Sequence, residues 1–142
     1  MRTVQSAPVR PLDRADLQPL AELSSRLAAE GRRDWSQRLG RAGTVVVGAE
    51  LDGKLVGYAA GEVRRSFGRA TPGAWIDAFG VEAAYRGRGI GRSLLSALLA
   101  RLRELGADRA FTLVPLHDRT MAPFFRELGF REEPLLPLGR EL

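Results

Sequence analysis

The first third of the chain is predicted to form two helices, the first of them from apolar residues at helical spacing. The recurring residues are Leu17, Leu20, Leu23 and Leu27. Asp13 precedes them as a suitable N-cap and Gly31 interrupts the pattern, so we expect an amphipathic helix between these two residues. The polar segment 34–41, followed by the helix breaker Gly43, predicts a second and shorter helix.

The strongest helical pattern lies in the second half of the chain. Apolar residues within 89–105 follow a three- and four-residue spacing that Gly106 ends, which predicts a long helix. A last stripe over 121–128 predicts another helix. Thr120 is its expected N-cap, because Pro123 is tolerated only in the first turn.

Four segments between these helices have the composition of β-strands. Segments 44–50 and 55–63 flank an Asp-Gly pair, the strongest short hairpin signal, and predict two antiparallel strands. Segment 75–81 is apolar on both faces, as in a covered central strand, and 109–114 is another apolar strand. The predicted fold is α/β, with a mixed central sheet and helices on both faces, and its last two strands form a right-handed parallel crossover.

Length and composition limit the class of protein. The chain has 142 residues, 44% hydrophobic and 27% charged, which predicts one soluble domain over 1–142. No segment approaches the roughly 18 apolar residues of a membrane span, and the N-terminus does not resemble a secretory signal. We therefore expect a cytoplasmic protein with no membrane partner. Because the chain has no cysteine and one histidine, His117, we also expect no metal.

The net charge of +5 comes almost entirely from arginine, since Lys54 is the only lysine. Arginine binds phosphate through a planar fork, which suits an anionic ligand, although nucleotide bias in the coding genome would give the same excess. The arginines are scattered along the chain and only 7% of its residues are aromatic. No nucleic-acid partner is therefore expected.

A glycine-rich turn joins the predicted strand 75–81 to the long helix. Segment 86–91 reads Arg-Gly-Arg-Gly-Ile-Gly, and Arg92 follows it. Glycines let the backbone approach a ligand, and the free N–H groups at a helix start attract phosphate. Three arginines there are unfavourable, because their charges lie beside the positive end of the helix dipole, unless a bound anion neutralises them. A bound diphosphate therefore explains the turn better than the alternative, a connector that binds nothing.

The spacing of these glycines excludes two common nucleotide motifs. A P-loop requires a lysine followed by serine or threonine, and this turn contains no lysine. A dinucleotide fingerprint requires G-x-G-x-x-G after the first strand, whereas the glycines here are spaced G-x-G-x-G and follow several predicted strands. Segment 81–95 instead closely resembles the acyl-CoA-binding motif of the GNAT N-acetyltransferase superfamily, whose core is Q/R-x-x-G-x-G/A. Segment 124–130 resembles the closing F-Y-x-x-x-G-F segment of that family, and the likeness extends from about Val9 to Phe130.

The resemblance implies the GNAT fold and an acetyl-CoA-dependent N-acetyltransferase. Acetyl-CoA would be the acyl donor, no metal would take part, and the acetyl group would pass directly to a primary amine of a small molecule or peptide. Backbone amides would hold the CoA diphosphate, and Val81 would hydrogen-bond the pantetheine arm between splayed strands. The residues so assigned are Val81, Arg86, Gly87, Arg88, Gly89, Ile90, Gly91 and Arg92. The tail 131–142 is short for the closing hairpin of the family, so we also expect a homodimer that covers the exposed sheet edge.

Three residues are candidates for accepting the proton of the amine, whose pKa is about 10. Asp77 lies on the central strand, where burial would raise its pKa, or it is a structural carboxylate satisfied by arginine or backbone. Glu82 lies at the strand end beside the expected thioester, or it is a solvated turn residue. His117 has a suitable pKa, or it is a polar surface residue.

The chain departs from the family pattern at Phe125, which stands where the resemblance places a tyrosine that protonates the departing thiolate. Tyr58 or Tyr85 could replace it, and a thiol with a pKa of about 8.5 leaves without much help. The departure supports a second hypothesis, a non-catalytic acyl-CoA-binding or interaction module on the same fold. A sensor of another phosphate ligand is a third.

Overall fold

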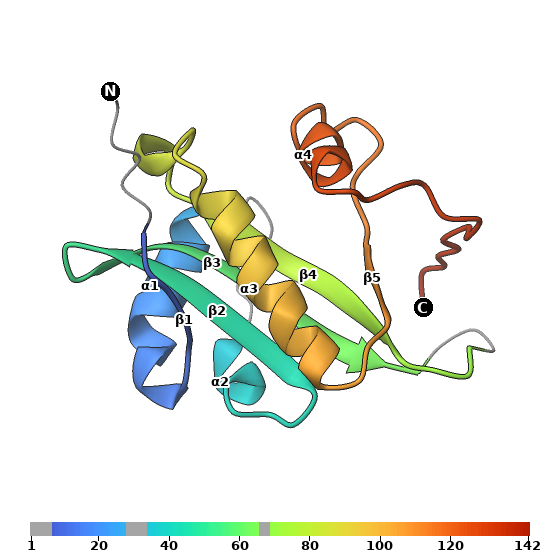
Figure 1. Ribbon diagram of the computed structural model, residues 1–142, viewed down its shortest axis with the longest axis horizontal. Helices are drawn as coiled ribbons and strands as arrows, with labels where there is room; N and C mark the ends of the chain where they lie inside the picture. The colour runs from blue at the N-terminus through green and yellow to red at the C-terminus, as the bar shows by residue number, and fades with distance from the viewer. Residues whose placement is uncertain (1–6, 28–33, 66–68) are drawn as a thin grey trace.

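One five-stranded sheet organises the chain (Figure 1). The structure is a computed structural model that describes residues 7–27, 34–65 and 69–142. The strands lie in the order of the sequence: β1 (Val9–Pro11), β2 (Thr44–Leu51), β3 (Lys54–Arg64), β4 (Gly73–Val81) and β5 (Arg109–Thr112). The first four are antiparallel to their neighbours, whereas β4 and β5 are parallel. The predicted mixed sheet and parallel crossover are therefore confirmed.

Helices cover both faces of this sheet (Figure 1). The helical elements are η1 (Arg14–Asp16), α1 (Leu17–Leu27), α2 (Trp35–Arg38), η2 (Ala83–Tyr85), α3 (Ile90–Glu104) and α4 (Met121–Glu127). The long helix α3 packs across β2, β3 and β4, while α1 packs on β3 and β4 from the opposite side. None of the helices in the described ranges is long and apolar enough to cross a membrane.

Two apolar clusters hold the layers together, one on each face of the sheet. The α3 cluster includes Leu94, Leu95, Leu98 and Leu102 of the predicted stripe, all at most 1% exposed. The opposite cluster joins α1, α2 and β3 through Leu20, Leu23, Trp35 and Tyr58. Burial of each such large side chain contributes about 1.5–3 kcal/mol. The leucine spacing of the sequence therefore corresponds to real packing on both faces.

The ends of the predicted elements differ in detail from the structure. Asp13 is an N-cap, as predicted, and forms a capping box with Asp16, although the first turn is 3₁₀ rather than α. The predicted end of that helix at Gly31 lies outside the described residues. The second helix is shorter than 34–41, because Gly40 follows it with a left-handed φ of 78°.

The N-terminus of α4 is capped by a residue that the sequence pattern does not single out. Thr120 is the N-cap by position, as predicted, but its side chain makes no capping hydrogen bond. The Asp118 carboxylate accepts instead from the amides of Thr120 and Met121, at 2.9 and 3.0 Å. These hydrogen bonds lower the pKa of Asp118 below its ordinary value. Asp118 therefore fixes where α4 begins beside β5.

Candidate active site

The sheet opens between β4 and β5. The two strands pair only from Gly73 with Arg109 to Ile76 with Thr112, where the Thr112 hydroxyl donates to the Ile76 carbonyl at 3.0 Å. The remaining part of β4, residues 77–81, has no β5 partner. The predicted strand 109–114 accordingly ends two residues early, because its chain turns away toward α4 (Figure 1). The carboxyl half of β4 thus presents a free backbone edge.

A β-bulge lies at the point where this opening begins. Ala60 pairs with Ala78 and Gly61 pairs with Ile76, so Asp77 is the extra residue on β4. The bulge changes which residues face α3: Ile76 packs in the α3 cluster, but Ala78 packs in the opposite one. The simple two-face alternation predicted for this strand is therefore wrong at Asp77.

Backbone groups at the end of β4 point into the opening. Glu82 donates its amide to the Val56 carbonyl at 2.9 Å. Because successive residues of a strand direct these groups to opposite edges, Val81 directs its own N–H and carbonyl to the open edge. The Arg86 Nε donates to that carbonyl at 3.2 Å. Val81 and Arg86, two of the residues predicted to bind acetyl-CoA, are therefore in contact.

The glycine-rich turn has the backbone geometry that its composition predicts. Gly87 and Gly89 have φ values of 77° and 79°, and a Cβ added at either would meet no atom within 4 Å. Their backbone is therefore exposed to a ligand, and a side chain is disfavoured there by conformation. Gly89 is the N-cap of α3 and offers no capping side chain, so the first amides of α3 lack acceptors among the described residues.

Three exposed arginines surround these amides. Arg86, Arg88 and Arg92 make no ion pair with any carboxylate in the described part of the chain. The Arg88 guanidinium lies 5.4 Å from the centre of the Tyr85 ring. Unpaired cations and unsatisfied amides at a helix start constitute an anion site. This chemistry fits the diphosphate of CoA.

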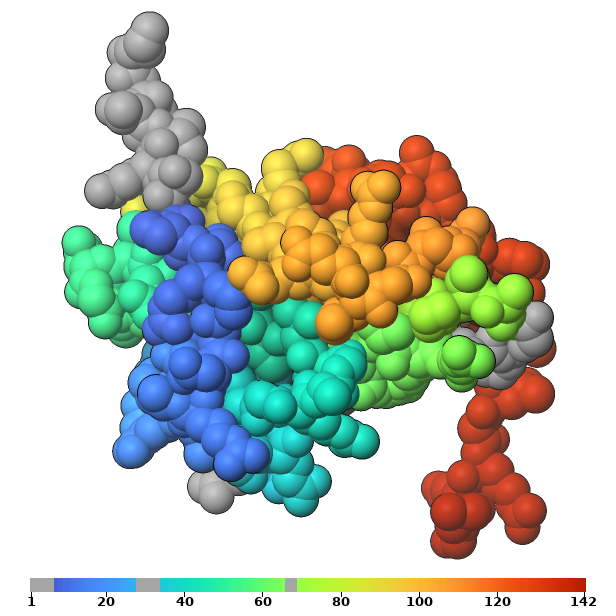
Figure 2. All heavy atoms as spheres, turned by 60° about the horizontal axis from the view of Figure 1, so that its bottom comes forward, coloured from blue at the N-terminus to red at the C-terminus, as the bar shows by residue number. Residues whose placement is uncertain are grey.

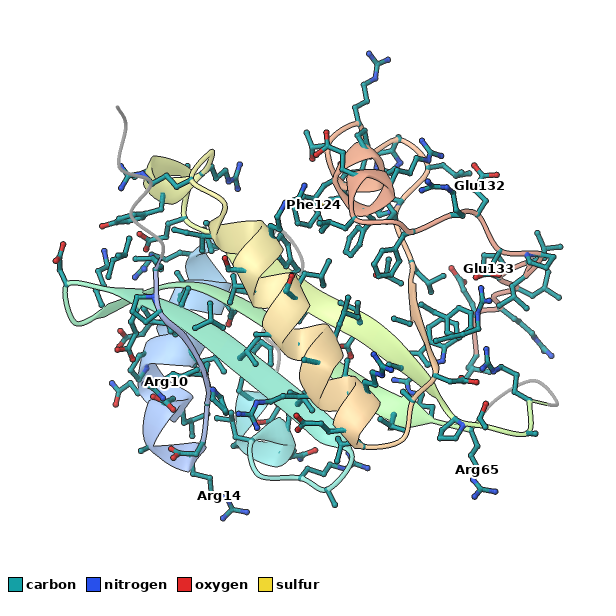
Figure 3. The ribbon with its side chains drawn as sticks, viewed as in Figure 1. Arg10, Arg14, Arg65, Phe124, Glu132 and Glu133 are labelled. Carbon is teal, nitrogen blue, oxygen red and sulfur yellow. The ribbon has the colours of Figure 1, made fainter. Side chains whose placement is uncertain are left out.

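Aromatic rings from α4 close the α3 side of the opening. Phe79 of β4 lies 5.1 Å from Phe124 and 6.5 Å from Phe125, between ring centres. Phe124 lies on the side of α4 that faces α3 (Figure 3). A Cβ on Gly91 would come within 2.9 Å of the Phe79 ring, so the third glycine of the motif serves close packing. Phe125, in the place of the family tyrosine, is a core residue at 4% exposure.

The proton-transfer candidate Asp77 is not buried, contrary to the expectation. Its side chain is 36% exposed, and its carboxylate accepts from Arg38 of α2 at 2.9 Å. Since the bulge turns Asp77 toward α2, the residue does not enter the apolar interior of the sheet. The alternative interpretation, a carboxylate satisfied by arginine, describes this contact.

The other two candidates differ in their surroundings. Glu82 is paired with Arg26 of α1 at 2.5 Å and with Lys54 of β3 at 3.6 Å, and its side chain is only 15% exposed. It is therefore not a solvated turn residue. His117 is exposed in the loop between β5 and α4. The structure does not bring His117 into a hydrogen bond with either carboxylate within the described residues.

Sequence reasoning missed the partners of both carboxylates. Arg26 and Arg38 are ordinary surface positions of their helices in the sequence, and their partners lie 56 and 39 residues away along the chain. No local signal predicts such pairing. From the sequence we also expect Glu30, Asp34 and Trp35 to shape the acceptor pocket. Asp34 and Trp35 lie at the start of α2, where Trp35 is fully packed, and Glu30 lies outside the described residues.

A separate pocket of about 260 Å³ lies at the other end of β4 and β5. It is lined by Arg69, Trp75, Arg109, Phe111, Glu133, Pro134 and Leu135. Two buried donors here, Arg69 Nε and Trp75 Nε1, lack partners among the described residues. Ligands of open α/β sheets usually bind at the carboxyl ends of strands, which makes the glycine-rich turn, and not this pocket, the candidate active site.

Comparisons with known proteins find a matching family and relatives of this chain. A family model described as "Acetyltransferase (GNAT) family" matches residues 10–130. The N-alpha-acetyltransferase RimI of Mycobacterium tuberculosis is 40% identical over 126 residues, which cover 84% of this chain and 75% of that protein.

Solved structures show the same fold at low sequence identity. AAC(6')-Iy in complex with a bisubstrate analogue of CoA and acetylneamine has a TM-score of 0.87 at 17% identity, covering 97% of this chain and 99% of that chain. The aminoglycoside N-acetyltransferase AAC(6')-Iy in complex with CoA has a TM-score of 0.83 at 20% identity, covering 95% and 99%. The comparisons favour an enzyme over a non-catalytic module.

Proposed function

Since this chain belongs to the acetyltransferase (GNAT) family and is therefore an N-acetyltransferase, we propose that it transfers an acetyl group from acetyl-CoA directly to a primary amine of a small molecule or peptide. One observation carries this proposal: unpaired arginines and unsatisfied amides lie next to the free edge of β4. An anionic donor with an extended amide-bearing arm suits both features.

The donor would be held mainly by backbone. The amides from Arg86 to Arg92 would bind the diphosphate, with the guanidinium groups of Arg88 and Arg92 adding charge. The pantetheine arm would lie along residues 77–81 as an additional strand, with the backbone groups of Val81 as hydrogen-bonding partners. This placement brings the thioester to the end of the sheet where β4 and β5 separate.

For the proton of the amine, Asp77, Glu82 and His117 remain the proposed acceptors, directly or through water. The two carboxylates lie on the same face of β4, each beside an arginine. His117 lies in the loop that follows β5. The pH profile of kcat/KM should keep its acidic limb in two of the variants Asp77→Asn, Glu82→Gln and His117→Ala, and lose it in the third.

A screen of amine acceptors tests the proposed activity. Release of CoA thiol from acetyl-CoA is measured with each amine, and mass spectrometry identifies the acetylated product. We expect acetylation of at least one amine well above the hydrolysis rate without amine. Thermal protection by acetyl-CoA without turnover of any amine would contradict the transfer reaction and leave only binding.

Three further properties belong to the same proposal. The chain would act as a single domain over residues 1–142 in the cytoplasm, without nucleic acid or membrane as a partner. A homodimer would cover the free edge of β5. The C-terminal residues extend from the body of the protein (Figure 2). These residues carry exposed leucines, with Leu136 at 80% and Leu138 at 87%. A monomer by light scattering would contradict the dimer.

A further inference from the structure

Among the described residues, side chains close the α3 face of β4 to the acceptor amine. On the α3 face, Phe79 and the α4 rings fill the space beside β4. On the opposite face, Asp77 and Glu82 project from the two ends of the unpaired segment 77–81 toward α2 and α1. An amine that approaches the free edge of β4 from this side meets the side chains of these two residues.

Asp77 and Glu82 are both already neutralised by the protein itself. Asp77 is paired with Arg38, whose side chain is 16% exposed, and Glu82 is paired with Arg26 and Lys54. A polycationic acceptor whose ammonium groups lose water here would need free carboxylates as their new partners. Here it would first have to displace an arginine from an existing ion pair.

The charges of this cluster do not merely cancel. It contains three cations, Arg26, Arg38 and Lys54, against the two anions Asp77 and Glu82. Arg26 and Lys54 are more than half exposed, so their positive charge reaches an approaching molecule. A second ammonium group on the acceptor would be repelled, whereas a hydroxyl or carboxylate would be tolerated or attracted.

We propose that the acceptor is a monoamine, a molecule whose reactive amine is its only positive charge and whose remaining groups are neutral or acidic. The inference rests on the proposed N-acetyltransferase function and adds the substrate class. It separates this chain from structural neighbours that act on aminoglycosides, since those acceptors carry several amines.

A matched series of acceptors tests this proposal. Aminopentanoate, aminopentanol and diaminopentane present the same primary amine on the same carbon chain, with an acidic, neutral or cationic far end. Short peptides with a free N-terminus followed by glutamate, serine or lysine form a parallel series. We expect kcat/KM for the cationic member to be lower by about tenfold than for the neutral member in the series that the enzyme accepts.

Variants that release one carboxylate should weaken this discrimination. Arg38→Gln leaves Asp77 without this partner, and Arg26→Gln leaves Glu82 with only the more distant Lys54. Each should raise the cationic-to-neutral ratio of kcat/KM several-fold, by roughly the effect of one charge. Arg101→Gln on exposed α3, on the other face of the sheet, changes the net charge equally and should leave the ratio unchanged. Two independent variants keep the test valid if one of them does not fold.

The outcomes distinguish this inference from the function on which it rests. A wild-type enzyme that acetylates the cationic member as fast as the neutral one, or faster, overturns the monoamine proposal and leaves N-acetyl transfer standing. An equal change of ratio in Arg101→Gln and Arg38→Gln also overturns it. Absence of turnover with every amine of both series overturns the transferase function as well.

Discussion

The glycine-rich turn differs in the pairing of its charges from the face of β4 that is directed toward α1 and α2. At the turn, Arg86, Arg88 and Arg92 lack acidic partners among the described residues. On the other face, Asp77 and Glu82 are paired with cations from three different elements. An unpaired cationic site is completed by an anionic ligand, whereas a paired site is complete without one. This difference fits the proposed anionic donor at the turn and a proposed acceptor whose groups other than the reactive amine are neutral or acidic.

The largest expected effect concerns the donor side of this comparison. Acetyl-CoA at about one hundred times its Kd should stabilise the wild-type protein by about 2.7 kcal/mol. Gly89→Asp should abolish this gain, because it places a carboxylate among the amides that would bind the diphosphate. Thermal unfolding with and without acetyl-CoA measures the effect.

Gly106→Asp is the matched control for this experiment. It places the same substitution at another glycine with a left-handed φ, 101°, at the opposite end of α3. This variant should be less stable but should keep the full protection by acetyl-CoA. If acetyl-CoA stabilised Gly89→Asp and the wild type equally, the turn would not be part of the acetyl-CoA site.

The packing beneath the turn gives the next largest effect. Gly91→Val should lower the free energy of unfolding by about 1–3 kcal/mol, since its Cβ would lie 2.9 Å from the Phe79 ring and 3.3 Å from the Phe124 ring. Denaturant unfolding measures the loss. Phe79→Leu should recover part of it in the double variant, because it removes the nearer atom. Additive losses in the double variant would show that the two residues are not in contact.

The smallest expected effect concerns the ion pairs that join β1 and β2 to η1, the turn that precedes α1. Arg10 pairs with Asp16 and Glu50, and the hydrogen bond from Arg10 lowers the pKa of Asp16 below its ordinary value of 3.8. A lowered folded pKa means that the stabilisation is present above that value and is lost as the pH falls through the folded pKa.

Asp16→Asn should therefore cost about 1 kcal/mol at neutral pH and progressively less below pH 4. Unfolding measured over a pH series detects this trend. A cost that stays constant down to low pH would assign the loss to capping geometry and not to charge. Protection by acetyl-CoA should be the same in this variant as in the wild type.

The same contrast explains which features could be predicted from the sequence. The turn consists of consecutive residues, so its glycines, its arginines and the start of the following helix can be recognised together in the sequence. The family resemblance then predicts that acetyl-CoA is the ligand. The leucine stripes similarly predict α1 and α3, because periodicity is a local property. The fold class and the strand order along the chain follow from these elements.

The surroundings of Asp77 and Glu82 could not be predicted, because the residues that contact them lie far away along the chain. The bulge at Asp77 depends on how β3 and β4 pair, and the partners of Asp77 and Glu82 come from helices that pack on the sheet only in the folded protein. The sequence therefore indicates Asp77 as a buried carboxylate, whereas the bulge turns it to α2. The role of Asp118 as the cap of α4 was missed because Thr120 directly precedes the apolar stripe and is itself a possible cap.

A crystal structure of the protein with CoA tests the central claim most directly. The account predicts the diphosphate within hydrogen-bonding distance of the backbone amides between Gly87 and Arg92, and the pantetheine arm along residues 77–81. Density for CoA in the pocket beside Trp75 and Phe111, or none at the turn at saturating CoA, would contradict the assignment of the donor site and the acceptor side built upon it.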